Sequence, residues 1–180
     1  MFFLKNIILI IPIFYFGFTN SSFSQIYPIY NEIPSIAVVD QEALFRKSKW
    51  GKDILNQIEL LVSSLNTENE TIKNNLELEE LILTEKRKIV SKSEFNVMTF
   101  DFDLKVKKIR TQQADKQNNI NSLLNNKRAL FFKKSTPILL TLINDLGVEV
   151  LLNKDMVALA SLKSDITQIA IKRIDEILKD

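Results

Sequence analysis

The feature that most constrains this chain is a stripe of apolar residues that repeats every three or four positions between residues 55 and 90. This spacing places the repeating side chains on one face of an α-helix. The stripe consists of Leu55, Ile58, Val62, Leu65, Asn69, Ile72, Leu76, Glu79, Leu83, Lys86 and Val90. Residues 53–90 contain no glycine and no proline, which predicts one helix of about 37 residues, roughly 55 Å long. Because the stripe is narrow, the helix should pack along a partner helix.

A second long helix is predicted to follow the first. Ser91 and Glu94 have the spacing of a capping box, in which each side chain accepts a hydrogen bond from the other residue's backbone amide at a helix start. A weaker stripe then consists of Phe95, Thr99, Phe102, Val106, Ile109, Gln113, Lys116, Ile120, Leu123, Lys127, Leu130 and Lys134. Thr136 and Pro137 suit the N-cap and first residue of a continuing helix, and Gly147 suits its C-terminal end.

If the two helices fold back at residues 91–92, groups of opposite charge meet. The acidic group is Glu77, Glu79 and Glu80, and the basic group is Lys105, Lys107, Lys108 and Arg110. Asn69 would then lie opposite Gln112, Gln113 and Lys116, so both stripes become polar at the same height. We interpret this as a soft point in the hairpin. The alternative is a polar contact that fixes the register.

The flanking segments predict a small body that contains β-structure. Residues 36–39 form an apolar run typical of a buried strand, followed by a short helix and a loop around residues 48–51. Asp53 is a reasonable N-cap for the first long helix. After Gly147, residues 148–152 and 156–160 predict a β-hairpin, and Ser164 or Asp165 can cap a last helix.

The predicted fold class is α+β and mostly α, with a long antiparallel helical hairpin projecting from a small β body. We expect one domain over residues 36–180. Within it the helical hairpin takes residues 54–146, and the body takes residues 36–53 and 147–180. A sheet this small cannot bury its own faces. We therefore expect several chains to assemble and cover them.

The N-terminus predicts an export signal. Lys5 precedes an apolar stretch over residues 7–18, and Ser22 and Ser24 form a small-x-small cleavage site, so residues 1–24 should be removed. The alternative is a membrane anchor, but about 12 apolar residues are few for a span of roughly 20. Residues 25–35, with two prolines, are expected to form an extended leader.

Composition excludes most enzyme classes. The chain has no histidine, no cysteine and only 3 glycines. It therefore offers no serine–histidine triad, no thiol nucleophile, no usual zinc site and no glycine-rich phosphate loop. We expect no enzymatic activity, no cofactor and no metal. With 24 Lys+Arg against 22 Asp+Glu, binding to nucleic acid is not expected either.

The order of these segments resembles the Skp/OmpH family of periplasmic chaperones. The resemblance rests on Ile-Ala-Val-Val-Asp at 36–40 with Leu44 and Phe45, on residues 83–95 and 102–109, on 147–153, and on Ser-Asp-Ile-Thr at 164–167. It implies a homotrimer in the periplasm whose body carries three helical hairpins around a cavity. It also implies that unfolded outer-membrane proteins are held there without ATP. The net charge of this chain is nearly balanced, whereas the better-known members of the family are strongly basic. Electrostatic attraction to clients or lipids should therefore be local or weak.

Three sets of candidate residues follow. Near the predicted turn, Phe100, Met98, Phe95 and Phe102 are candidates for client contact, although Phe95 and Phe102 also occupy stripe positions. The basic residues Lys86, Arg87, Lys88 and Lys92 are candidates for weak contact with a membrane surface or with acidic client segments; the alternative is a solvated helix face. The body and trimer-interface candidates are Ile36, Val38, Leu44, Phe45, Val148, Val150, Leu152, Val157 and Leu159.

The predicted function is therefore a periplasmic holdase that keeps unfolded outer-membrane proteins from aggregating. The alternative from another class is a structural trimeric coiled-coil spacer or envelope tether. A spacer would favour well-filled stripes without a gap, and the polar layer near Asn69 argues against it.

Overall fold

The computed structural model describes residues 35–178. The predicted signal peptide and nearly all of the predicted leader therefore lie outside the described residues. The elements in chain order are β1 (Ile36–Val39), α1 (Gln41–Lys47), α2 (Lys49–Lys86), α3 (Lys92–Asp145), β2 (Val150–Asn153), the single-turn helices η1 (Lys154–Met156) and η2 (Leu162–Ser164), and α4 (Thr167–Ile177). The predicted class, α+β and mostly α, is confirmed.

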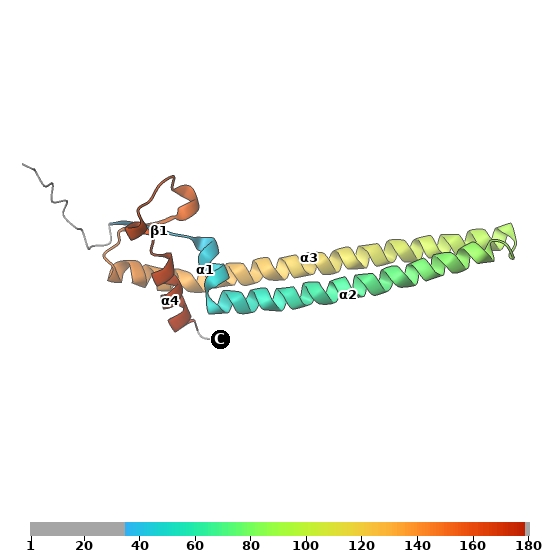
Figure 1. Cartoon of the computed structure of the whole chain (residues 1–180), viewed down its shortest axis with the longest axis horizontal. Helices are drawn as coiled ribbons and strands as arrows, with labels where there is room; N and C mark the ends of the chain where they lie inside the picture. The colour runs from blue at the N-terminus through green and yellow to red at the C-terminus, as the bar shows by residue number, and fades with distance from the viewer. Residues whose placement is uncertain (1–34, 179–180) are drawn as a thin grey trace, which may run out of the picture. The chain divides into compact units, whose positions relative to one another are not determined.

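Helices α2 and α3 form the long antiparallel hairpin (Figure 1). Elements β1, α1 and α4 lie around the C-terminal part of α3, and the hairpin extends away from them. The turn between the helices is closed by the predicted capping box. The Ser91 hydroxyl accepts from the Glu94 amide at 3.3 Å, and the Glu94 carboxylate accepts from the Ser91 amide at 3.1 Å.

The β-structure is a two-stranded parallel sheet of β1 and β2, in which Ile36 pairs with Val150 and Val39 with Asn153. Parallel strands need a long crossover connection, and here the crossover is the entire helical hairpin. On its other side β1 forms a single bridge, in which the Ile166 amide donates to the Val38 carbonyl at 3.0 Å.

The predicted second β-hairpin is wrong. Strand β2 ends at Asn153, whose side chain accepts from the Asp155 amide at 3.4 Å and caps η1. No strand forms in the part of the described chain between η1 and η2. The continuous apolar run over 156–160 suggested a strand, but the side-chain cap turns the backbone into a 3₁₀ helix before a partner strand can start.

Helix α2 begins earlier than predicted. Its N-cap is Ser48, whose side chain accepts from the Gly51 amide at 3.2 Å, so the expected loop at 48–51 is a helix start and Asp53 is not the cap. Gly51 lies in the first turn, packed against the end of α1. A Cβ at this position would lie 2.7 Å from the carbonyl carbon of Phe45. Glycine here permits close backbone approach rather than a loop.

Helix α3 runs without a break through Pro137, contrary to the predicted restart at Thr136 and Pro137. The Thr136 hydroxyl instead donates to the Phe132 carbonyl at 2.8 Å. Proline removes one helical hydrogen bond, but burial of the flanking Ser135 and Ile138 in the body holds this part of the helix in place.

The predicted end at Gly147 is correct. Its φ is +69°, a conformation that glycine adopts without strain. The amides of Gly147 and Val148 donate to the carbonyls of Asn144 and Ile143 at 3.2 and 2.9 Å. These two bonds form a Schellman motif, which satisfies the last carbonyls of α3.

The core lies where the hairpin meets α1 and α4. Phe45, Phe131, Leu142, Ile166 and Ile174 are fully buried there. Phe131 meets Phe45 edge-on, with ring centroids 5.4 Å apart, and stacks on Trp50 at 5.7 Å. Burying each side chain of this size contributes about 1.5–3 kcal/mol, so this cluster anchors the root of the hairpin.

Candidate functional site

The contact between α2 and α3 follows the predicted stripes over most of the hairpin. From Leu55 to Val90 and from Phe95 to Ile120, the apolar stripe positions are buried or half-buried. Beyond Ile120 the buried face shifts by one residue, to Leu124, Phe131 and Ser135 in place of Leu123, Leu130 and Lys134. A strict seven-residue repeat drifts by about 20° per heptad on a straight helix, which explains this shift.

A polar layer interrupts the apolar contact midway along the hairpin, but Glu68 rather than Asn69 supplies it. The Glu68 carboxylate accepts from Gln113 Nε2 at 3.1 Å and pairs with the Lys116 ammonium. These bonds, that of Lys116 first, hold the pKa of Glu68 below its ordinary value. The Oε1 atom of Gln113 is buried without a partner among the described residues, so the layer is incompletely satisfied.

Beside this layer, the two helices leave a shallow groove of about 610 Å³. Its floor is apolar, with Leu76, Phe102 and Val106 among the lining residues, and its rim carries both charges. The predicted acidic–basic match is present next to it, where Glu79 pairs with Lys105. The groove is open, so it suits transient contact with a flexible chain better than tight enclosure of a small molecule.

The client-contact candidates differ in exposure. Phe100 is 62% exposed, whereas Met98, Phe95 and Phe102 are half-buried. Met98 lines a small open depression with Val97. Phe95 and Phe102 pack at the helix contact, as their stripe positions imply, so Phe100 offers the most accessible aromatic surface of the four.

The basic candidates surround the turn between the helices. Lys86, Arg87, Lys88 and Lys92 are all exposed. Lys88 pairs with Glu85 at 2.8 Å, and the Arg87 guanidinium lies 5.8 Å from the centre of the Phe95 ring. Exposed pairs of this kind contribute little to stability, so the charges remain available to a partner.

The body candidates divide into two groups. Val38, Leu44, Phe45 and Val148 are buried in the chain's own core, and Val157 is half-buried. The exposed candidates are Ile36, Val150, Leu152 and Leu159, the last of these 93% exposed. Two residues that the sequence prediction missed, Met156 and Leu162, are exposed on the same segment.

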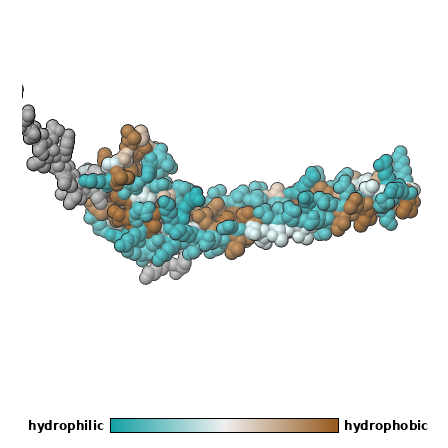
Figure 2. Space-filling view, viewed as in Figure 1, coloured by the Kyte–Doolittle hydropathy of each residue, from teal (hydrophilic) through white to brown (hydrophobic). Residues whose placement is uncertain are grey.

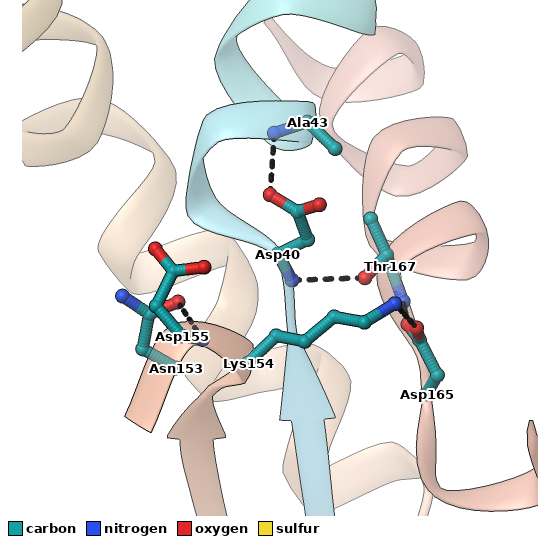
Figure 3. A network of polar contacts seen from close by, with 7 residues as sticks. All are labelled: Asp40, Ala43, Asn153, Lys154, Asp155, Asp165 and Thr167. Carbon is teal, nitrogen blue, oxygen red and sulfur yellow. Dashed lines mark hydrogen bonds and ion pairs between the residues drawn. The ribbon is translucent and has the colours of Figure 1, made fainter. Parts of the chain in front are cut away.

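A polar network fastens this apolar segment to the body (Figure 3). The Lys154 ammonium donates to Asp165 at 2.7 Å, and Asp165 also accepts from the Thr167 amide at 3.0 Å. Burial raises the pKa of Asp165, but these hydrogen bonds outweigh it and hold that pKa below its ordinary value. The Thr167 hydroxyl accepts from the Asp40 amide at 2.9 Å and ties the start of α4 to the end of β1.

The prediction also missed an exposed aliphatic group at the far end of α2. Leu81, Ile82 and Ile89 lie off the stripe, and Ile89 is 80% exposed. Figure 2 shows apolar surface recurring along the hairpin and reaching its far end. The spacing of Leu78, Leu81 and Ile82, three and four residues apart on α2, could have revealed a second apolar helical face outside the stripe.

The part of the chain over residues 35–178 holds no group of three acidic side chains able to share a metal ion. It also has no helix with the length and apolarity needed to cross a bilayer.

The fold and surfaces define an elongated helical hairpin on a small α/β body, with apolar and basic groups displayed on open surfaces. A crystal structure from Caulobacter crescentus CB15, described as that of an OmpH-like candidate outer membrane chaperone, has this fold, with a TM-score of 0.73. The two chains are 15% identical, and the match covers 81% of this chain and 86% of the other. No protein-family model and no curated protein matches the sequence. The resemblance to the Skp/OmpH family is confirmed at the level of the fold.

Proposed function

We propose that this chain is an ATP-independent holdase chaperone of the periplasm that binds unfolded outer-membrane proteins and prevents their aggregation. The observation that carries the proposal is the large apolar surface of the hairpin outside its own helix contact. Leu60, Leu78, Phe100 and Leu104 are all at least half exposed on α2 or α3. Surfaces of this kind mark sites of protein interaction, and the fold shared with an OmpH-like structure supports the same role.

A holdase without ATP works by reversible binding, which lowers the free concentration of aggregation-prone chain. Open apolar patches bind weakly one at a time, and several of them acting on one client raise the overall affinity. A homotrimer would place three hairpins around one cavity. Exposed Val150, Leu152 and Leu159 support this assembly, because β2 has no partner on its outer side within the described chain.

Phe100 and Met98 are the proposed client-contact residues. Both lie on α3 close to the turn between the two helices. Phenylalanine and methionine adapt to many apolar partners. Phe95 and Phe102 contribute mainly by holding the helices together at this height.

The test is light scattering by an unfolded outer-membrane barrel protein diluted from denaturant, with and without this chain, together with a mass measurement. We expect suppression of scattering by a trimer. The F100S/M98S variant should suppress less while remaining trimeric, and I169S/I177S, two exposed apolar positions on α4 away from the hairpin, is the matched control. A monomer that leaves scattering unchanged would refute the proposal.

A further inference from the structure

The open groove between α2 and α3 has charged residues on both of its walls, and the register of the hairpin orders them. The ion pair of Glu79 with Lys105 fixes which residues of the two antiparallel helices lie at the same height. Counted from this pair, the groove residues Lys73 on α2 and Arg110 on α3 share one height. The end of the groove towards the body is therefore basic.

The opposite end of the groove is acidic, because Glu80 on α2 and Asp103 on α3 share a height there. The two charged ends are seven residues apart on each helix, roughly 10 Å at 1.5 Å per residue. The side chains of Lys73, Glu80, Asp103 and Arg110 are all exposed. None of the four forms an ion pair within residues 35–178.

The middle of the groove is apolar, with Leu76 and Val106 between the two charged ends. Along the hairpin the surface thus runs from basic through apolar to acidic. Only one further charge lines the groove, that of Glu77 close to its midpoint. A surface with this order is complementary to itself when a second copy is turned end over end, which is the condition for a two-fold symmetric contact.

We propose that this groove docks the hairpin of a second copy of this chain in the antiparallel direction. A two-fold axis across the middle of the groove sets α2 against the α2 of the second copy, and α3 against its α3. Lys73 then meets Glu80 of the partner subunit, and Arg110 meets Asp103 of the partner subunit. The apolar stems of the lysine and arginine cover the opposite floor while their charged ends pair at the rim.

Parallel packing of two hairpins is disfavoured by the same four charges. At equal heights the basic end of one groove faces the basic end of the other, and the acidic ends also face each other. Hairpins that extend in one direction from a shared body, as in the proposed trimer, therefore repel each other at this groove. Hairpins of two opposed assemblies attract. The contact goes beyond holdase activity and needs no client.

The length of the hairpin leaves room for this arrangement. After rotation about the middle of the groove, the end of α2 at Lys86 lies close to Thr67 of the partner subunit, well short of the root of the hairpin at Lys49. The two bodies therefore do not collide. One such contact is small and should be weak, and two opposed trimers would join through three contacts that act together.

An extended client segment is the competing occupant, and the charges favour the second copy. A client would need an acidic and a basic side chain roughly 10 Å apart, about three extended residues, to match both ends of the groove. An unfolded chain need not carry this pattern. A second copy supplies all four charges at the matching spacing.

The first test is sedimentation equilibrium of the full chain without client at rising protein concentration. We expect the mass of the basic assembly to double, and this association should weaken as salt is raised. K73E/R110E and E80K/D103K should each associate about a hundredfold more weakly, because four attractive pairs in each contact become repulsive. An equimolar mixture of the two variants should associate again, because an acidic rim then meets a basic rim.

Matched controls carry the same charge changes outside the groove. K107E/K108E and E70K/D101K alter exposed residues of α3 and α2 that do not line it. Both should associate like the wild type, and circular dichroism checks that all variants are folded. Recovery of association in the mixture shows in addition that the two groove variants retain the hairpin.

The second test measures direction by disulfide formation, which requires Cα atoms within about 7 Å. The chain has no cysteine of its own. Under mild oxidation K73C mixed with E80C should form a crosslinked dimer, whereas K73C alone and E80C alone should not. E77C lies close to the two-fold axis and should crosslink with its own copy.

A wild-type mass that does not rise with concentration would overturn the proposal. Association unchanged by both groove variants would do so as well, and so would crosslinking of K73C alone in preference to the mixture with E80C, which indicates parallel packing. If the groove variants lost client protection although the wild type never associates, the groove would belong to the client. In that case holdase activity would stand and the contact between copies would fall.

Discussion

Replacing Gly51 by alanine should destabilise the protein, although the position lies inside a helix. In an unobstructed helix this substitution stabilises by about 0.5–1 kcal/mol, because alanine loses less backbone entropy on folding. At Gly51 the added Cβ would lie 2.7 Å from the Phe45 carbonyl carbon, closer still to its oxygen, and 3.0 Å from Ser48 Oγ. The nearest obstacle is backbone, which cannot rotate away, so α1 and α2 must move apart.

The size of the effect follows from two opposing contributions. Overpacking of a well-packed site costs about 1–3 kcal/mol, and the upper end applies here. Separation of the helices also disturbs the buried Phe45 ring and the Ser48 cap. After subtracting the helix-propensity gain, we expect G51A to lose about 2 kcal/mol of unfolding free energy.

Urea unfolding followed by circular dichroism measures this loss, at one protein concentration because association would raise the apparent stability. G147A serves as a control, because its loss of stability should have a different cause. Its Cβ meets nothing within 4 Å, but φ is +69°, so the cost is conformational and should be about 1 kcal/mol. If G51A were as stable as the wild type, the close approach of α1 and α2 at this point would be refuted.

Three further predictions concern other parts of the chain. S135A should gain about 1 kcal/mol in urea unfolding, because the buried Ser135 hydroxyl has no partner among the described residues; a loss of stability would reveal a hidden bond. Asp165 has a lowered pKa when folded, so it contributes stability above its ordinary pKa of about 3.9, and this contribution is lost as pH falls through the folded value. D165N should therefore flatten the acid unfolding profile measured by circular dichroism, and superimposable profiles would contradict the assignment. Amides near Glu68 should exchange hydrogen faster than those near Ile58 if the polar layer is a soft point, and equal protection would remove that hypothesis.

The hairpin could be predicted well from sequence because its determinants are local. Stripe periodicity identified both long helices, and the capping box at Ser91 located the turn between them. The same reasoning placed Glu79 near Lys105. The polar layer was predicted at Asn69, but the neighbouring Glu68 supplies it. A long acidic side chain can reach across the helix contact from a flanking position.

The body was predicted less well because its determinants are not local. Gly51 was predicted to lie in a loop, because the sequence does not reveal that the Phe45 carbonyl packs against its backbone. Pro137 was predicted to start a helix, but the packing of Phe131 and Leu142 in the core stabilises α3 on both sides of it. Near the turn the basic residues were singled out from the sequence, but the exposed Leu81 and Ile82 were not, because they lie on a face of α2 outside the stripe.

The parallel pairing of β1 with β2 also sets an order of events in folding. Strand β1 ends at residue 39, and its partner begins at residue 150. The buried residues Val38 and Val39 therefore lack their β partner until the chain has passed out along one helix and back along the other. Local helix formation and the closing of the hairpin must shorten this long loop before the sheet can form. In a chain that emerges N-terminus first, the helical hairpin should therefore form before the two-stranded sheet of the body.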